Sequence, residues 1–124
     1  MIVEIEPMEK KPGEEGKLEV KIVNSGPPRG VYAGYMLEFY MSGVFLTGFG
    51  FQTFPELVEA EKVFEFSYAM PSAGEILYLA QQHGIPEVSD VLAEGLVYAY
   101  VETGECIGRL TYRWPYRIPA EHLK

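Results

Sequence analysis

This sequence is poor in the side chains from which most catalytic and metal sites are built. Among its 124 residues there are one cysteine and two histidines. The single cysteine, Cys106, excludes an intramolecular disulfide, and no neighbouring histidine or lysine is present to activate its thiol. His83 and His122 are far apart in the sequence, whereas a zinc site needs three or four ligands at recognisable spacing. We therefore expect an inert thiol, no metal, no cofactor and no enzyme activity.

Basic residues are also scarce. Ten lysines and arginines stand against 18 acidic residues, which gives a net charge of −8 and a pI near 4.7. An acidic domain repels the phosphate backbone, so we expect no nucleic-acid partner. Glutamate supplies nearly all of the acidity, since Asp90 is the single aspartate, and Asn24 is the single asparagine. That bias is typical of proteins from thermophiles.

Long hydrophobic runs are missing as well. No stretch approaches the roughly 20 apolar residues that cross a bilayer, and residues 1–6 lack the basic and apolar regions of a signal peptide. If the chain is complete, we expect no membrane insertion and a cytoplasmic or particle-associated location. The length is that of one domain. We assign residues 1–114 to this domain and residues 115–124, which include Pro115 and Pro119, to an extended C-terminal arm.

What the sequence does contain is alternation of polar and apolar residues. In residues 17–23, Leu18, Val20 and Ile22 point one way and charged residues point the other, as in a half-buried strand. We predict a shorter strand at the first residues, where Val3 and Ile5 point one way and Glu4 and Glu6 the other. Glycine and proline turns separate further strands that we predict at residues 32–41, 44–51, 62–70, 75–82, 96–102 and 106–112. The residues that we expect to be buried are Leu18, Val20, Ile22, Leu37, Phe39, Phe64 and Phe66.

One segment has a different spacing. Val88, Val91 and Leu92 follow the i, i+3, i+4 pattern of a helix, Pro86 suits its first turn and Gly95 suits its end. We therefore predict a short helix near residues 86–94. Taken together, these elements predict an all-β fold, an immunoglobulin-like antiparallel β-sandwich of seven to eight strands with one short helix.

Two segments resemble immunoglobulin-like β-sandwich modules of the CARDB adhesion type. Residues 12–27 have the Pro-Gly-Glu turn, the alternating strand and the Asn-x-Gly ending with which those modules begin, and residues 64–71 resemble one of their later strands. The aromatic residues 43–54 and the predicted helix depart from the pattern. This resemblance implies the sandwich fold and says little about function.

The most unusual segment is the run from Phe39 to Pro55, which carries no charge. It could be a buried central hairpin, an apolar contact surface for another protein or another copy of this chain, or an aromatic platform for a sugar or small molecule. Nine tyrosines, seven phenylalanines and one tryptophan are many for one small core, and surplus aromatic residues often mark interfaces. The candidate binding residues in this run are Val44, Phe45, Leu46, Phe49, Phe51 and Phe54.

Alternation within that run makes a specific prediction. If Phe45 and Phe49 point to the core, Val44 and Leu46 point outward and form part of a smooth apolar face. A lysine at Leu46 would then disrupt association and leave the stability of the fold nearly unchanged.

A second candidate surface lies near the end of the chain, where three arginines fall within nine positions. Alternation places Arg109 and Arg113 on one face of a strand, opposite the face that carries Trp114. These arginines could pair with glutamates on the neighbouring strand, or they could form a docking stripe for an acidic partner. The candidate binding residues here are Arg109, Arg113, Trp114 and Arg117.

These patterns favour a protein that binds or assembles. We expect a non-catalytic protein-interaction or structural assembly module, for example a component of a virus particle or surface filament, with a protein partner or as a homo-oligomer. The alternative is a small ligand- or carbohydrate-binding β-sandwich domain that uses the aromatic hairpin. A concave pocket lined by aromatic residues would favour the alternative, whereas a flat or convex apolar patch would favour assembly.

Overall fold

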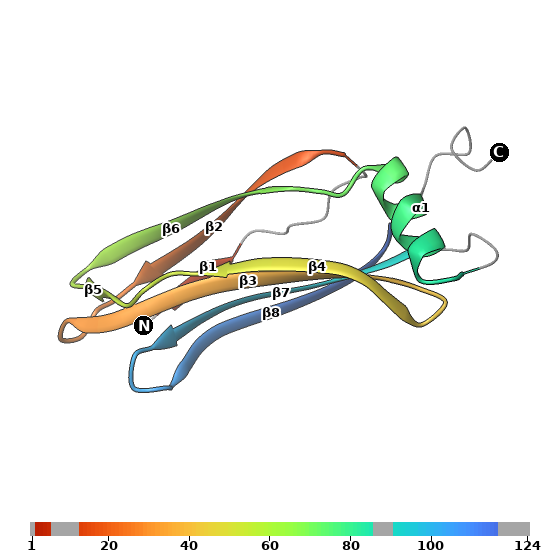
Figure 1. Ribbon diagram of the computed structural model, residues 1–124. Coiled ribbons are helices and arrows are strands. Elements are labelled where there is room, and N and C mark those ends of the chain that lie inside the picture. The colour runs from red at the N-terminus through yellow and green to blue at the C-terminus, as the bar shows by residue number, and fades with distance from the viewer. Residues whose placement is uncertain (1, 6–12, 86–90, 117–124) are drawn as a thin grey trace.

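A computed structural model describes residues 2–5, 13–85 and 91–116, which form two antiparallel sheets packed face to face (Figure 1). The small sheet has the order β1 (Ile2–Ile5), β2 (Glu15–Val23), β6 (Glu61–Ala69). The large sheet has the order β4 (Val44–Gln52), β3 (Arg29–Met41), β7 (Val91–Val101), β8 (Cys106–Tyr116), and β5 (Glu56–Val58) also pairs with β3. With the one helix, α1 (Ala73–Gln82), these eight strands confirm the predicted antiparallel β-sandwich.

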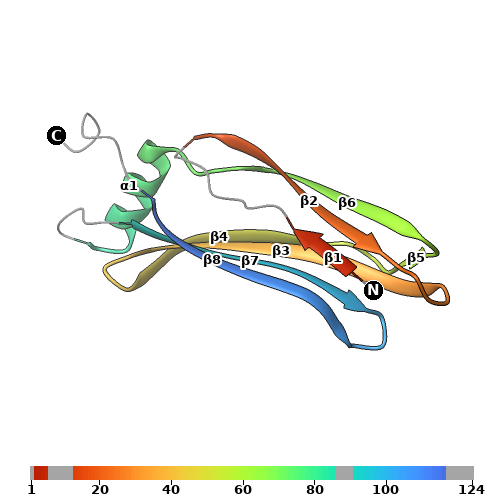
Figure 2. The same ribbon diagram turned by 180° about the vertical axis from the view of Figure 1, so that it is seen from behind.

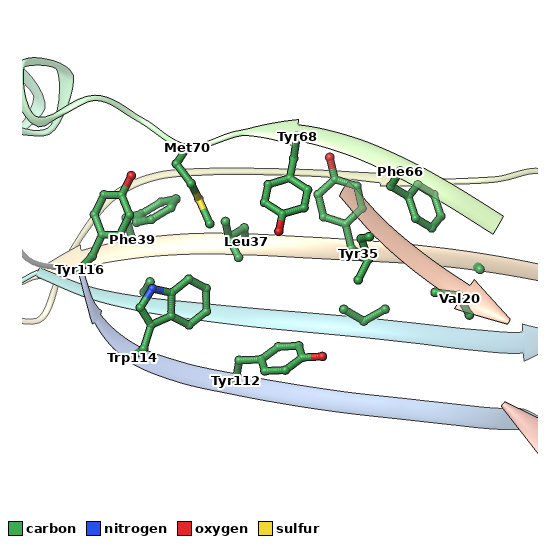
Figure 3. Close-up of a cluster of buried hydrophobic side chains, with 14 of the residues drawn as sticks. Val20, Tyr35, Leu37, Phe39, Phe66, Tyr68, Met70, Tyr112, Trp114 and Tyr116 are labelled. Atoms are coloured by element: carbon green, nitrogen blue, oxygen red, sulfur yellow. The ribbon is translucent and has the colours of Figure 1, made fainter. Parts of the chain in front are cut away.

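The core is the layer of side chains between the two sheets (Figure 3). Ring contacts dominate it: Tyr35 meets Phe66 with centroids 5.3 Å apart, and Phe39 meets Tyr116 at 4.8 Å. Such pairs add stabilisation beyond the apolar area that they bury. Figure 2 shows β1 beside β8 at one side of the sandwich, where Gly108 leaves room for the side chain of Val3. All seven residues predicted to be buried are buried: Leu18, Val20, Ile22, Leu37, Phe39, Phe64 and Phe66.

The helix does not lie where the sequence pattern predicts it. Residues 75–82, which we predicted as a strand, belong to α1. Its first turn is capped by Ser72, whose side-chain oxygen accepts a hydrogen bond from the Glu75 backbone N–H at 3.1 Å. Ile76 and Ala80, four residues apart, turn the buried side of the helix toward the sandwich. The cap and this spacing outweigh the weak alternation of the segment.

The helix predicted near residues 86–94 is wrong for its last four residues and untestable for the rest. Residues 91–94 are the beginning of β7, and residues 86–90 lie outside the described part of the chain. From Val91 to Val101 every second side chain is buried, and the strand pairs with β3 from Met41 to Val31. Long antiparallel pairing therefore decides the conformation of a segment whose first apolar residues also fit a helix.

The predicted domain boundary at residue 114 falls inside β8. Pro115 and Tyr116 continue this strand, with Pro115 opposite Leu92 of β7. A proline is tolerated there because β8 is an edge strand and needs no backbone N–H on its outer side. The remainder of the predicted arm, residues 117–124, lies outside the described residues, and Arg117 lies there too.

Tyr116 connects the end of β8 to the loop before α1. Its hydroxyl donates a hydrogen bond to the carbonyl oxygen of Pro71 at 2.6 Å, inside the core. Burial raises the pKa of Tyr116 well above the ordinary value of 10.0. The folded protein therefore favours the neutral phenol, and the unfolded chain loses this proton at lower pH than the folded protein does.

We expect this difference to appear as loss of stability in alkali. The contribution of Tyr116 is fully present below pH 10.0 and declines as the pH rises above that value. The variant Tyr116→Phe should be about 1 kcal/mol less stable near neutral pH, because one hydrogen bond is lost, and its stability should decline less steeply above pH 10. Denaturant unfolding at a series of pH values measures both effects. Tyr78→Phe, at an exposed position of α1, is the control and should behave as the wild type.

Candidate functional site

Apart from the three-residue β5, the sandwich has four edge strands among the residues that the structure describes: β1, β4, β6 and β8. Edge strands offer unpaired backbone groups to other chains, and proteins usually guard them with charged residues or proline. Of these four, β4 alone has neither. The guarding residues of the other three edges are Glu4 in β1, Glu61, Lys62 and Glu65 in β6, and Arg109, Arg113 and Pro115 in β8.

A β-bulge in β4 overturns the predicted facing of its first residues. Phe39 lies opposite Thr47, but Tyr40 lies opposite Phe45, so Leu46 is the extra residue. Leu46 points into the core and is 4% exposed, whereas Phe45 turns outward and packs edge-on against Tyr40 with centroids 5.7 Å apart. Because the bulge inserts one extra residue, the alternation of inward and outward side chains along β4 shifts by one position there. Leu46 is therefore a core residue, and the outward face predicted for it is wrong.

The remaining hairpin candidates differ in exposure. Phe49 is half-buried between Tyr35 and Phe39, with ring centroids 6.3 Å from each. Phe51 is 60% exposed, and its ring lies 6.2 Å from that of Phe66 in the core, measured between centroids. Val44 and Phe45 are exposed, and Phe54 is 89% exposed beyond the end of the strand. The most exposed phenylalanines of the hairpin, Phe51 and Phe54, are therefore those at the far end of β4.

Backbone hydrogen bonds show which peptide groups of β4 are left at the edge. The N–H of Thr53 donates to the carbonyl oxygen of Ala33 at 2.9 Å. The odd-numbered residues of β4 therefore direct their backbone N–H and C=O groups toward β3. The carbonyl oxygen of Leu37 also points toward β4, because a Cβ atom added at Gly48 would lie 3.0 Å from it. Bonded and unbonded residues alternate along an antiparallel strand. Hence the even-numbered residues direct their N–H and C=O groups away from β3, and these are Gly48, Gly50 and Gln52.

These three residues form what we call the β4 edge. Two of them are glycines, so no side chain shields the backbone groups that point outward. Gln52 is held by Tyr98, whose hydroxyl donates to its side-chain oxygen at 2.8 Å. None of the three is among the binding residues predicted from the sequence. The sequence signal that could have identified this edge is glycine at alternate positions of a charge-free strand. Glycine weakens a strand, and it often marks a place where another backbone approaches closely.

The predicted arginine face is confirmed, and one of its residues is paired. Arg109 and Arg113 are exposed on one side of β8. Arg113 Nη2 lies 3.0 Å from Glu94 Oε1 on the neighbouring strand, as expected for a solvated cross-strand pair. Trp114, which is also among the predicted binding residues, points inward and is 8% exposed, so it packs in the core. Its indole N–H has no hydrogen-bond partner within the described structure.

Two hollows on the described part of the surface are not lined by the aromatic hairpin. A hollow of about 340 Å³ lies over β3, β7 and β8, and one of about 520 Å³ lies over β2 and β6. Beside the first, the Tyr40 hydroxyl donates to the Glu38 carboxylate, a hydrogen bond that raises the pKa of Tyr40. The residues that line the first hollow include Met36, Glu38, Glu94, Leu96, Arg109 and Arg113.

The described residues contain no group of three or more histidine, cysteine, aspartate or glutamate side chains that could hold a metal ion. Cys106 is exposed, so burial would not slow a reagent that attacks it. The expectation of an inert thiol therefore depends on the absence of an activating neighbour in the sequence. Within residues 2–5, 13–85 and 91–116, no helix is long and apolar enough to cross a membrane.

Comparison with known proteins finds solved structures of similar fold and does not identify a function. No protein-family model matches the sequence, and no curated protein matches it. The structure is similar to that of Spo0M, a sporulation control protein from Bacillus subtilis, with a TM-score of 0.50 and 14% identity over 91% of this chain. The match covers 46% of the Spo0M chain, so this chain spans less than half of that protein. A protein from Archaeoglobus fulgidus matches with a TM-score of 0.50 and 15% identity, over 94% of each chain.

Proposed function

We propose that this domain is a non-catalytic protein-interaction or assembly module that holds a protein partner on the β4 edge. The observation that carries the proposal is a charge-free edge strand whose outward backbone groups, at Gly48, Gly50 and Gln52, have no neighbouring strand in the described structure. An extended segment of a partner can add to such an edge, with main-chain hydrogen bonds providing affinity.

Apolar side chains beside the edge support this mode of binding. Phe51 and Phe54 are exposed next to the unpaired backbone. Leu57 of β5 is also exposed, on the other face of the sheet from Phe51. Charged residues follow Phe54 in the chain, beginning with the Glu56–Lys62 ion pair, in which the carboxylate and ammonium are 2.8 Å apart. An apolar centre with charged residues at its border is the usual composition of a protein interface.

The hollows support a small-molecule function less well. A carbohydrate or ligand platform would place the exposed phenylalanines in a concave pocket. Neither of the two hollows is lined by Phe45, Phe49, Phe51 or Phe54. We therefore favour a protein partner over a sugar or another small ligand.

A synthetic strand tests whether the edge accepts a partner. The probe is a fluorescent peptide of alternating threonine and valine with lysines at both ends, titrated with dilute protein and followed by anisotropy. We expect the wild type to bind it. Phe51→Lys should weaken binding at least about tenfold, because an added strand would remove water from the lysine ammonium group.

The matched control is Tyr78→Lys. Tyr78 is an aromatic residue with the same 60% exposure as Phe51, but it lies on α1. Its replacement should leave peptide affinity unchanged. Absence of binding by the wild type, or equal affinity of all three proteins, would contradict the proposal.

A further inference from the structure

The partner on the β4 edge can be specified further, on the premise that the proposed function is correct. We infer that a second copy of this chain occupies the edge. The two β4 strands are then antiparallel and related by a twofold axis that passes between the two copies of Gly50. The large sheets of the two copies then form one continuous sheet. Charge is compatible with this arrangement, and register and side-chain fit favour it.

Charge is compatible with a second copy at the β4 edge. Each chain carries a net charge of −8, so two copies repel each other across most pairs of surfaces. The β4 edge avoids this repulsion because neither strand brings a charge to it. A strongly charged partner strand would find no opposite charge along β4. The nearest carboxylate, Glu38, lies one strand behind, opposite Gly48, and already accepts a hydrogen bond from Tyr40.

The bulge and the alternation of faces limit the register. Two residues that lie opposite each other across an antiparallel pair share a face of the sheet. The twofold axis must therefore pass midway between the two copies of one residue, which lie opposite each other. Regular pairing is possible only beyond Leu46, where the strand is without a bulge, from Thr47 to Gln52. Registers centred on residues 48 to 51 satisfy both conditions, and those centred on Phe49 and Gly50 pair the longest stretch of strand, five residues from each copy.

Hydrogen bonds favour the register centred on Gly50. In that register the outward-directed residues face one another: Gly50 lies opposite Gly50 of the second copy, and Gly48 lies opposite Gln52 in both directions. Each such pair exchanges two bonds, which gives about six hydrogen bonds. With the axis at Phe49, only Gly48 and Gly50 pair, in both directions, which gives about four.

Side chains favour the same register. The register centred on Gly50 places Phe51 opposite Phe49 of the second copy, and the reverse, on the inner face of the joined sheet. These aromatic pairs would cover Phe51, which the single chain leaves 60% exposed. Directly opposed aromatic residues stabilise antiparallel strands. On the outer face, Gly48 and Gly50 have no side chains to obstruct the approach.

Light scattering and amide hydrogen exchange measured by NMR test the inference on the purified chain. The mass should rise with concentration to that of two chains. In the concentrated sample, the amides of Gly48, Gly50 and Gln52 should exchange at least about tenfold more slowly than in the dilute sample. The amides of Phe49 and Phe51 already bond to β3, so their exchange should change much less. Phe51→Lys should stay monomeric, and Tyr78→Lys should associate as the wild type does.

Four results would overturn the inference, each in a different way. A monomer at up to about 1 mM, from a protein that still binds the threonine–valine peptide, would remove the second copy and leave the proposed function standing. A monomer that also fails to bind the peptide would remove both. A dimer in which Gly48 and Gly50 become slow while Gln52 stays fast would move the axis to Phe49, and a dimer with all three amides fast would place the interface elsewhere.

Discussion

Replacing Leu46 with lysine is expected to unfold the domain. Leu46 is the extra residue of the β-bulge in β4, and its side chain lies in the core. Loss of a buried leucine alone costs about 2–5 kcal/mol, and a buried ammonium group adds a further penalty because it has no partner there. Single domains are stable by only about 5–15 kcal/mol. Denaturant unfolding followed by circular dichroism measures the effect.

Phe45→Lys is the control for this prediction. Phe45 precedes Leu46 in the chain but points outward and is half-exposed, so lysine there can keep its charge in water. We expect its stability to stay within about 1 kcal/mol of the wild type. If the Leu46→Lys protein were instead soluble and folded but no longer self-associated, Leu46 would point outward, as alternation predicts.

The second large effect is expected from Phe66→Ala. Phe66 projects from β6 into the core and meets the Tyr35 ring. Truncation of a buried phenylalanine typically costs about 3–5 kcal/mol, since it removes apolar contacts and leaves a cavity. The measurement is the free energy of unfolding in denaturant, with Phe54→Ala as a control that should change stability by less than about 0.5 kcal/mol. A loss below about 1 kcal/mol at Phe66 would mean that β6 presents its other face to the core.

Alternation predicted the core well because most strands here are regular. From Leu18 to Ile22 in β2 and from Phe64 to Tyr68 in β6, polar and apolar residues alternate without interruption, so the buried faces follow directly from the sequence. The absence of charge from Phe39 to Pro55 also singled out the segment that forms β4. The bulge at Leu46 could not be predicted in this way, because its position depends on which residues of β3 lie opposite.

Other errors had a signal that was present but outweighed. Ser72 followed three residues later by Glu75 is a helix-start pattern, and it competed with a short alternating stretch that we interpreted as a strand. Alternation placed Trp114 on the correct face of β8, yet sequence alone could not say that this face is the inner one. The resemblance to CARDB-type modules remains a prediction, since the comparisons do not bear on it.

The guarded strands have a consequence for the size of any assembly. Once two copies join through β4, the outermost strands of the joined sheet are the two copies of β8, with Arg109, Arg113 and Pro115 along each. Those residues discourage a third copy from adding by the same mechanism. Because the pairing uses the same surface on both partners, it closes on itself. The chain would then serve as a coupler that joins whatever is attached to it in twos, and a filament built on the β4 edge alone would not grow.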